Sequence, residues 1–545
     1  MIVGVNTDTV AEQVGSLLAG LGVGHAFGVV GSGNFHVTNA LRHAGVGWTA
    51  ARHEGGAVTM ADAFARTSGE VAVATLHQGC GLTNALTGIT EAAKSRTPLL
   101  VLAADTASSA VRSNFRIDQD ALVRSVGAVA ERVHSPESAA TDVLRAYTTC
   151  RNERRTVVLN LPLDVQARPA VPATVPGPTT WSPVRPDPAA VARLAELLRS
   201  AERPVFIAGR GARAAGDELA TLADRCGALL ATSAVAHGLF GTDPWSLGIA
   251  GGFATPLAAE LITDADLVVA WGASLTMWTT RHGALLGEAA TVVQVDDTAS
   301  ALGAQRPVDL PVLGDVAATA RDVLAVVAGQ RVGYRTGTVA ARLRTDARHG
   351  APPEVVGERI DPRVLSAALD DLLPVERTVA VDSGNFMGYP AGYLRVPDAA
   401  GFCFTQAFQS IGLGLATAIG AAIARPDRVA VAACGDGGFL MGISELETAV
   451  RLGLGMVIVV YDDGGYGAEF HHFADDDHTC VRFGDTDLAA IARGHGCVAA
   501  TVRSTADLGA VTEWLAGPRD RPLLVDAKVV ADEPSWWLAE AFRGH

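Results

Sequence analysis

The sequence predicts an α/β protein made of three successive doubly wound domains, each built on a parallel sheet. Apolar runs of strand length alternate with helical runs along most of the chain, a pattern typical of parallel sheets whose strands are joined by helices. Two stretches, one rich in proline and one polar, divide the chain into three parts. A length of 545 residues also suits about three domains of ~150 residues.

The first domain is expected at residues 1–170. Apolar residues recur at helical spacing over 9–22, and Thr9 with Glu12 fits a capping box at the start of this helix. A short buried strand, HAFGVVG, follows the helix. Further strands are expected at 71–77, 97–105 and 156–162.

A proline-rich stretch at 171–188 cannot hold regular structure for long and is expected to be a linker. The central domain follows at 189–330, with strands in RPVFIAG, ALLATS, ADLVVAWG and TVVQVD. A polar, arginine-rich segment at 331–360 is expected to be the second linker. The third domain is expected at 361–545, with strands in TVAVDSG, RVAVAACGDG, GMVIVVYDD and RPLLVDAKV.

Composition excludes several classes of protein. Apolar residues make up 49% and charged residues 19% of the chain, which suits a packed α/β protein. With a formal charge of −15 and no cluster of Lys and Arg, neither nucleic acid nor a membrane surface is expected as a partner. The start of the chain lacks the features of a signal peptide. The seven cysteines never form a CxxC pair, which indicates neither a disulfide framework nor zinc. We expect a cytoplasmic location.

Carboxylates follow two apolar strands of the third domain. One strand ends at Gly435, Asp436, Gly437 and Gly438, and glycines at such a place let backbone N–H groups approach a phosphate. Asp436 would repel a phosphate unless a cation bridged them. Asp463 arrives 27 residues later, after one helix and one strand, which returns the chain to the same sheet edge. Two carboxylates and a glycine carbonyl there predict a hard divalent cation.

These two motifs together resemble the diphosphate and magnesium motif of thiamine-diphosphate-dependent enzymes, the family of pyruvate decarboxylase, benzoylformate decarboxylase, pyruvate oxidase and acetolactate synthase. The resemblance implies thiamine diphosphate and Mg²⁺ as cofactors. It implies metal ligands at Asp436, Asp463 and Gly465, and further cofactor contacts at Gly435, Gly437, Gly438 and Tyr466. The family usually has two asparagines where this chain has Asp462 and Asp463, so an aspartate at 463 adds a negative charge beside the diphosphate.

A second match lies in the first domain, where residues 51–69 resemble the segment that activates the cofactor. The resemblance implies that Glu54 hydrogen-bonds the aminopyrimidine ring and promotes its imino tautomer, which removes the thiazolium C2 proton. We expect burial against apolar neighbours to raise the pKa of Glu54.

Two further stretches of the third domain agree with this family. Residues 409–424 resemble the segment in which a bulky side chain, here Ile411, bends the cofactor while the Gln409 carbonyl faces its aminopyrimidine. Gly384 and Asn385 lie where the family contacts the diphosphate. The matches span the chain in the order of a pyrimidine-binding, a central Rossmann-like and a diphosphate-binding domain.

The substrate side resembles several members of the family. Ser32 and His77 correspond to a serine and a histidine of benzoylformate decarboxylase, and Glu469 falls where enzymes of the pyruvate decarboxylase type have a catalytic glutamate. A glutamate and a histidine would suit proton transfer to an enamine intermediate after carbon dioxide leaves. The resemblance implies a 2-oxo acid decarboxylase or carboligase, with the site between subunits of a homodimer or homotetramer.

Alternatives within and outside the family stay open. An acetolactate synthase would bind FAD in the central domain, but 271–283 shows no clear counterpart of the flavin contacts, so we expect no FAD. Residues 209–216 do not have the GxGxxG spacing of an NAD site. A catalytically silent homologue is the alternative of another class, and the intact Glu54 argues against it. Weaker readings remain for Asn114 and Gln119 as cofactor contacts, His77 as a core residue, and His471 and His472 as surface residues.

Overall fold

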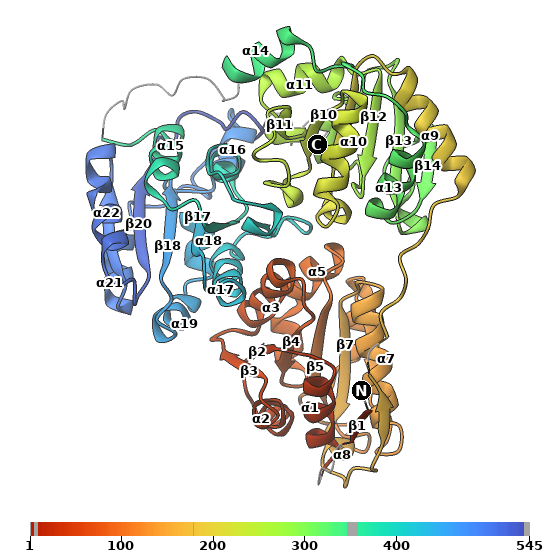
Figure 1. Ribbon diagram of the computed structural model, residues 1–545. Helices are drawn as coiled ribbons and strands as arrows, with labels where there is room; N and C mark the ends of the chain where they lie inside the picture. Colours follow the sequence, from red (N-terminus) through yellow and green to blue (C-terminus); the bar gives the residue numbers. More distant parts are fainter. Residues whose placement is uncertain (1, 5–8, 178, 346–357, 539–545) are drawn as a thin grey trace.

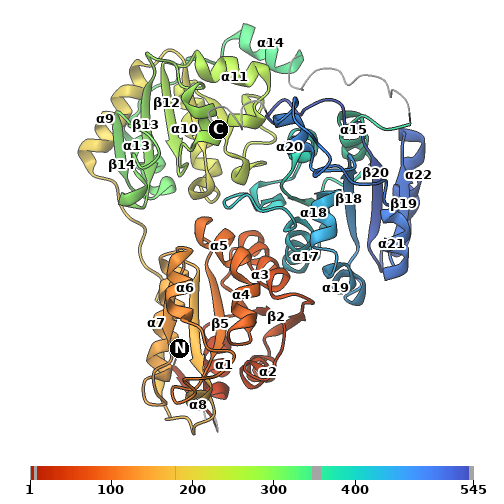
Figure 2. The same ribbon diagram turned by 180° about the vertical axis from the view of Figure 1, so that it is seen from behind.

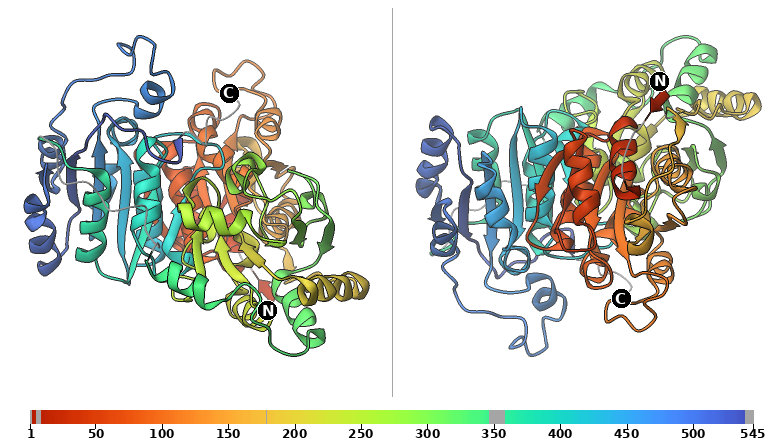
Figure 3. Two further views of the ribbon diagram at one scale, coloured as in Figure 1. Left: turned by 90° about the horizontal axis from the view of Figure 1, so that it is seen from above. Right: turned by 90° about the horizontal axis from the view of Figure 1, so that it is seen from below.

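The computed structural model describes residues 2–4, 9–177, 179–345 and 358–538. It contains three six-stranded parallel sheets, one for each part of the chain, as the sequence predicts (Figure 1). Figure 2 shows the same arrangement from behind. In the view from below in Figure 3, the first domain lies across the junction of the other two.

The first sheet has the order β3-β2-β4-β5-β7-β6. Its strands are β2 (His25–Gly28), β3 (Gly47–Ala50), β4 (Ala72–Leu76), β5 (Leu99–Asp105), β6 (Val129–Arg132) and β7 (Val157–Pro162). The helices between them are α1 (Val10–Gly20), α2 (Phe35–His43), α3 (Glu54–Ser68), α4 (Cys80–Asn84), α5 (Leu86–Lys94), α6 (Gln119–Ser125) and α7 (Ala139–Asn152), with α8 (Leu163–Gln166) after β7. The predicted capping box of α1 is present at Thr9 and Glu12.

The central sheet has the order β11-β10-β9-β12-β13-β14, which is the strand order of a Rossmann fold. Its strands are β9 (Pro204–Ala208), β10 (Leu229–Thr232), β11 (Ser246–Ile249), β12 (Leu267–Trp271), β13 (Thr291–Asp296) and β14 (Leu310–Leu313). The larger helices are α9 (Pro188–Ser200), α10 (Gly216–Cys226), α11 (Pro256–Thr263) and α13 (Val316–Val326). A short helix, α12 (Met277–Thr280), follows β12.

The third sheet has the order β16-β15-β17-β18-β20-β19. Numbered along the chain, its strands have the same order as those of the first sheet. They are β15 (Arg377–Val381), β16 (Phe402–Phe404), β17 (Val429–Gly435), β18 (Met456–Asp462), β19 (Val498–Val502) and β20 (Leu523–Lys528). The helices are α15 (Pro362–Leu372), α16 (Gly388–Tyr393), α17 (Gly414–Ala424), α18 (Asp436–Met441), α19 (Glu445–Arg451), α20 (Gly467–His472), α21 (Leu488–His495) and α22 (Gly509–Ala516).

The first and third domains share one hydrophobic core. Helices α3 and α17 lie side by side at its centre (Figures 1 and 2). Their backbones approach so closely that a Cβ atom on Gly420 would lie 2.1 Å from the carbonyl oxygen of Met60. Small residues on both helices therefore fix the position of the helix that begins at Glu54 relative to the third sheet.

Both predicted linkers contain one short regular element. In the first, β8 (Thr174–Pro176) pairs antiparallel with β1 (Ile2–Gly4). In the second, α14 (Gly337–Thr345) buries Val339 against the central domain, and Arg342 forms an ion pair with Glu260 at 2.7 Å. Tertiary contacts thus order segments whose local sequence is polar. Residues 346–357 lie outside the described part of the chain.

Over the described residues, none of the helices has the length and apolar character needed to cross a membrane.

Candidate active site

A glycine-rich cradle, formed by residues 435–438, lies at the carboxyl edge of the third sheet, where β15 and β17 are neighbours. Helix α18 begins at Asp436, so the glycine loop passes directly into a short helix that precedes α19. A Cβ atom on Gly437 would lie 2.5 Å from Cε1 of Tyr466, and one on Gly438 would lie 2.5 Å from Oδ2 of Asp382. Only glycine lets the backbone lie this close, as a phosphate cradle requires.

Asp382, at the end of β15, holds the cradle to the segment with Ile411. Its carboxylate accepts hydrogen bonds from the backbone N–H groups of Ser383 at 2.8 Å and Gly412 at 3.0 Å. Burial raises the pKa of Asp382 to about 6, although these N–H donors act in the opposite direction. The sequence motif predicts contacts at its neighbours Gly384 and Asn385 but not at Asp382. The pattern that could have predicted Asp382 is an acidic residue directly after a buried strand.

The predicted cofactor contacts at 384, 385, 409 and 411 differ in their local structure. Gly384 has φ 146°, a conformation that favours glycine. The side chain of Asn385 is not free, since its Oδ1 accepts a hydrogen bond from the Ser535 N–H at 3.1 Å. Gln409 has φ 62°, a strained backbone for a non-glycine residue, and its side chain lines a neighbouring cavity. Ile411 is half-buried.

Asp436 and Asp463 fit a site for a divalent cation. Burial raises the pKa of Asp436 to about 7, and the charge of Asp462 adds to this effect. Burial also raises the pKa of Asp463 to about 8, with further contributions from Asp436 and Asp462. Buried carboxylates that repel one another are stabilised by a bound cation. Within the described residues no three His, Cys, Asp or Glu side chains form a metal-binding group, so backbone and phosphate oxygens would complete the coordination.

We predict that Asp463→Asn changes how the stability of the metal-free protein depends on pH. Because the folded-state pKa of Asp463 lies near 8, above the ordinary 3.8, its ionisation destabilises the fold as pH rises from about 4 to 8. After discounting for partial solvent contact, the melting temperature of the variant should gain about 5 °C on the wild type between pH 5 and pH 8. Calorimetry in a chelator measures this, and parallel pH profiles would contradict it.

Glu54 is the first residue of α3, and His53 caps the helix by accepting a hydrogen bond from the Gly55 N–H at 3.0 Å. The Glu54 carboxylate accepts a hydrogen bond from Nδ2 of Asn84 at 3.1 Å. Glu54 is half-buried and its carboxylate contact is polar, whereas we expected burial against apolar neighbours. Within the described part of the chain, Glu54 thus has a polar hydrogen-bond partner and partial exposure to solvent.

The entry to α3 is tied to the third domain of the same chain. The backbone N–H groups of Arg52 and His53 donate to the Glu445 carboxylate at 3.1 and 2.9 Å. Arg52 also forms an ion pair with Glu447 at 2.5 Å. Both glutamates lie on α19, which follows the glycine-rich cradle. Glu54 is therefore held beside the third domain, while its own carboxylate contacts its own domain.

Ser32 and His77 lie together at the carboxyl edge of the first sheet. The Ser32 Oγ is 3.4 Å from Nε2 of His77, and Nδ1 of the same ring is 2.9 Å from the Gln78 carbonyl oxygen. A carbonyl only accepts, so Nδ1 donates and Nε2 carries the free electron pair. His77 is thus a half-buried, oriented histidine that can accept a proton at Nε2.

Gln119 holds the turn after His77 in place. It is buried, its Oε1 accepts from the Gly79 N–H at 2.9 Å, and its Nε2 donates to Oδ1 of Asn160 at 2.7 Å. Asn114 is exposed. The two weaker candidates therefore differ in burial and in hydrogen bonding.

Glu469 is exposed on α20, the helix that follows the turn at Asp463. His471 and His472, on the same helix, are half-buried rather than fully exposed. Burial lowers the pKa of His471.

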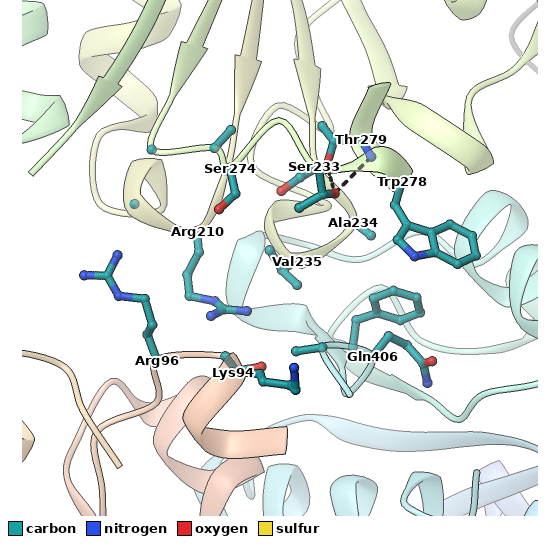
Figure 4. A pocket seen from close by; sticks show the side chains of 18 of the residues that line it. Lys94, Arg96, Arg210, Ser233, Ala234, Val235, Ser274, Trp278, Thr279 and Gln406 are labelled. Atoms are coloured by element: carbon teal, nitrogen blue, oxygen red, sulfur yellow. Dashed lines mark hydrogen bonds between the residues drawn. The ribbon is translucent and has the colours of Figure 1, made fainter. Parts of the chain in front are cut away.

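A separate cavity of about 540 Å³ lies where the three domains meet (Figure 4). It opens at the switch point of the central sheet, beside Gly209 and Gly272. Arg210 points into it with no acidic ion-pair partner among the described residues, and burial lowers the pKa of Arg210 to about 9. Both polar atoms of the Gln406 amide are also buried, with no hydrogen-bond partner in the described part of the chain. The segment 271–283, which shows no clear counterpart of flavin contacts in its sequence, supplies Ser274 and Trp278 to the wall of this cavity.

Three family models match the chain in order. Their descriptions are "Thiamine pyrophosphate enzyme, N-terminal TPP binding domain" at residues 8–123, the "central domain" at 191–323 and the "C-terminal TPP binding domain" at 382–527. Thiamine pyrophosphate (TPP) is another name for thiamine diphosphate.

Curated relatives resemble the chain over nearly its whole length. A probable 2-ketoarginine decarboxylase of Pseudomonas aeruginosa is 30% identical, over 92% of this chain and 90% of the relative. A sulfoacetaldehyde acetyltransferase of Rhodobacter capsulatus is 29% identical, over 85% and 83%. A putative acetolactate synthase large subunit of Mycobacterium tuberculosis is 30% identical, over 90% and 92%.

Proposed function

Because the chain belongs to the family of thiamine pyrophosphate enzymes, we propose that it acts on a 2-oxo acid by decarboxylation, by acyl transfer to an acceptor, or by both. The observation that carries this proposal is the meeting of the glycine-rich cradle with the buried carboxylate of Asp436 and the half-buried carboxylate of Asp463 at one sheet edge. That arrangement suits a diphosphate bridged by a divalent cation.

The residues of the third domain would hold the cofactor. Asp436, Asp463 and the Gly465 carbonyl would bind Mg²⁺, and the backbone of 435–438 would bind the diphosphate. Asp382 fixes the segment with Ile411, which would support the bent ring system. When bound, thiamine diphosphate supplies the nucleophilic carbon and the electron sink of the reaction.

The residues of the first domain would move protons. Glu54 would share its proton with the aminopyrimidine ring. His77 would exchange a proton with the substrate at Nε2, and Ser32 would orient the substrate carboxylate by a hydrogen bond. Glu469 would be a second proton donor or acceptor on the opposite wall.

We infer that a second copy of the chain completes each site, in a homodimer or homotetramer. Within one chain, the Glu54 carboxylate contacts Asn84 of its own domain. The aminopyrimidine ring would therefore reach Glu54 from the third domain of the second copy. Sedimentation should give a dimer or larger species, and an active monomer of about 56 kDa, the mass of the chain, would contradict this.

A panel of 2-oxo acids tests the reaction type. We expect carbon dioxide release from at least one member with Mg²⁺ and thiamine diphosphate present, and none after chelation of the metal. Adding aldehydes and other acyl acceptors separates decarboxylation from acyl transfer by product analysis. Cofactor binding without turnover of any donor would favour the catalytically silent alternative.

An acetolactate synthase-like reaction is the second candidate, and the central cavity is the observation that favours it. Arg210 and the Gln406 amide, which have no partners among the described residues, supply polar groups to this cavity for a bound cofactor. Acetolactate formed from pyruvate, together with flavin absorbance in the purified protein, would support this candidate. Protein free of flavin that still consumes a 2-oxo acid would support the first proposal.

A further inference from the structure

Lys528 is a buried lysine beside the candidate metal site. The chain has only two lysines, Lys94 and Lys528, among 43 basic residues. Lys94 is exposed, whereas Lys528 is 2% exposed at the end of β20. A buried ammonium ion is stable only where several acceptors surround it.

The register of the sheet brings Lys528 to the first of the two adjacent aspartates. Strands β18 and β20 are parallel neighbours, and Asp462 is paired with Lys528. Nζ of Lys528 lies 2.6 Å from Oδ2 of Asp462 and 2.8 Å from Oδ1 of Asp485. It also donates to the Thr486 carbonyl at 2.8 Å. These contacts use all three N–H bonds of the ammonium group, so it has none left for a cofactor.

The other polar groups of Asp462 are occupied as well. Its Oδ1 accepts a hydrogen bond from the Gly464 N–H at 3.1 Å, inside the turn that leads to Gly465. Its backbone carbonyl accepts from Arg359 and from the Val529 N–H, both at 3.0 Å. Asp462 is 2% exposed and is fully committed to the protein.

Asp463 is in a different position. Its Oδ2 packs against Gly467 so closely that a Cβ atom on that glycine would lie 2.2 Å from it. None of the ion pairs found in the described chain involves it, in contrast to Asp462. Of the two neighbouring carboxylates, Asp462 is therefore ion-paired with Lys528, whereas Asp463 has no ion pair among the described residues.

We propose that Lys528 is a positioning residue: by holding Asp462 in a buried ion pair, it fixes the turn at 462–465 and leaves Asp463 as the aspartate that faces the divalent cation. This inference depends on the cofactor site proposed above. Lys528 touches neither cofactor nor substrate and acts through Asp462. Asp526, 3.3 Å from Nζ, is the third carboxylate that the same ammonium ion compensates.

A set of three variants tests this role, namely Lys528→Met, Asp462→Asn and the double variant. The dissociation constant of thiamine diphosphate is measured by calorimetry at saturating Mg²⁺, well below each melting temperature. Lys528→Met should weaken binding at least about tenfold, since a buried carboxylate without its partner is expelled and the turn is released. Asp462→Asn should change binding less than about threefold, because Lys528 keeps two carboxylates and an amide oxygen still accepts from Gly464.

The double variant decides the question. It should bind at least about threefold more tightly than Lys528→Met, because the neutral amide at 462 needs no cation, whereas Asp485 and Asp526 still lose theirs. A matched control is Arg425→Met with Asp427→Asn, a surface ion pair of 2.7 Å in the same domain, which should leave binding unchanged. A lower melting temperature of Lys528→Met with unchanged cofactor affinity would show a merely structural role and overturn the inference, as would a double variant as weak as Lys528→Met. Wild-type protein that binds neither ligand would overturn the proposed function first.

Discussion

Replacing Glu54 by glutamine is expected to lower turnover at least about 100-fold while leaving cofactor affinity within a few fold. The amide keeps the size of the side chain and can still hydrogen-bond Asn84, the partner of Glu54 at 3.1 Å. It cannot share a proton with the aminopyrimidine ring, so the cofactor would bind without being activated. Carbon dioxide release and calorimetric binding of thiamine diphosphate, measured on the same sample, separate the two effects.

Glu70→Gln is the matched control for this variant. Glu70 is exposed just beyond the end of α3, so its loss changes the charge of the same helix region without touching the site. It should turn over at the wild-type rate. If Glu54→Gln keeps more than about a tenth of the wild-type turnover, Glu54 does not take part in the activation step. Loss of a general acid–base group lowers the rate at least about 100-fold.

Asp436→Ala is expected to weaken Mg²⁺-dependent binding of thiamine diphosphate more than about 100-fold, because it deletes a charged metal ligand from a site with few others. The same change should stabilise the metal-free protein at pH 8, since burial raises the pKa of Asp436 to about 7 and its charged form is therefore unfavourable in the fold. Weaker cofactor binding together with a higher metal-free melting temperature distinguishes a ligand from a structural residue.

The control for Asp436→Ala is Asp427→Ala, which removes an exposed carboxylate from the same domain. Binding should not change in the control. An Asp436→Ala protein that binds the cofactor normally, or that is less stable than the wild type without metal at pH 8, would contradict the metal role.

The two inactive variants together test whether each site is shared between subunits. If Glu54 of one subunit serves the cradle of another, a co-expressed hybrid of Glu54→Gln and Asp436→Ala chains has one site with both residues intact. Equal mixing into dimers should then restore about a quarter of wild-type activity. No recovery in a verified hybrid would place each complete site within one chain.

Local patterns in the sequence were enough to predict most of the scaffold. Strand length, helical spacing and turn residues act over a few positions, so the three parallel sheets and the capping box at Thr9 and Glu12 could be predicted directly. The glycines around Asp436 and the aspartates at 462 and 463 follow apolar strands, and parallel topology places such strand ends at one edge. The helix at 337–345 was missed because its polar sequence owes its order to contacts with the central domain.

The sequence by itself determined which residues stand at the strand ends, but only the tertiary structure decided how they divide the work. Lys528 is 66 positions from Asp462, Gly412 is 30 from Asp382 and Ser535 is 150 from Asn385. No local spacing links such pairs, because sheet register and chain return bring them together. The physical reason is that a buried charge or polar group must find its partner in three dimensions, and the partner it finds determines which carboxylate remains free for a cation.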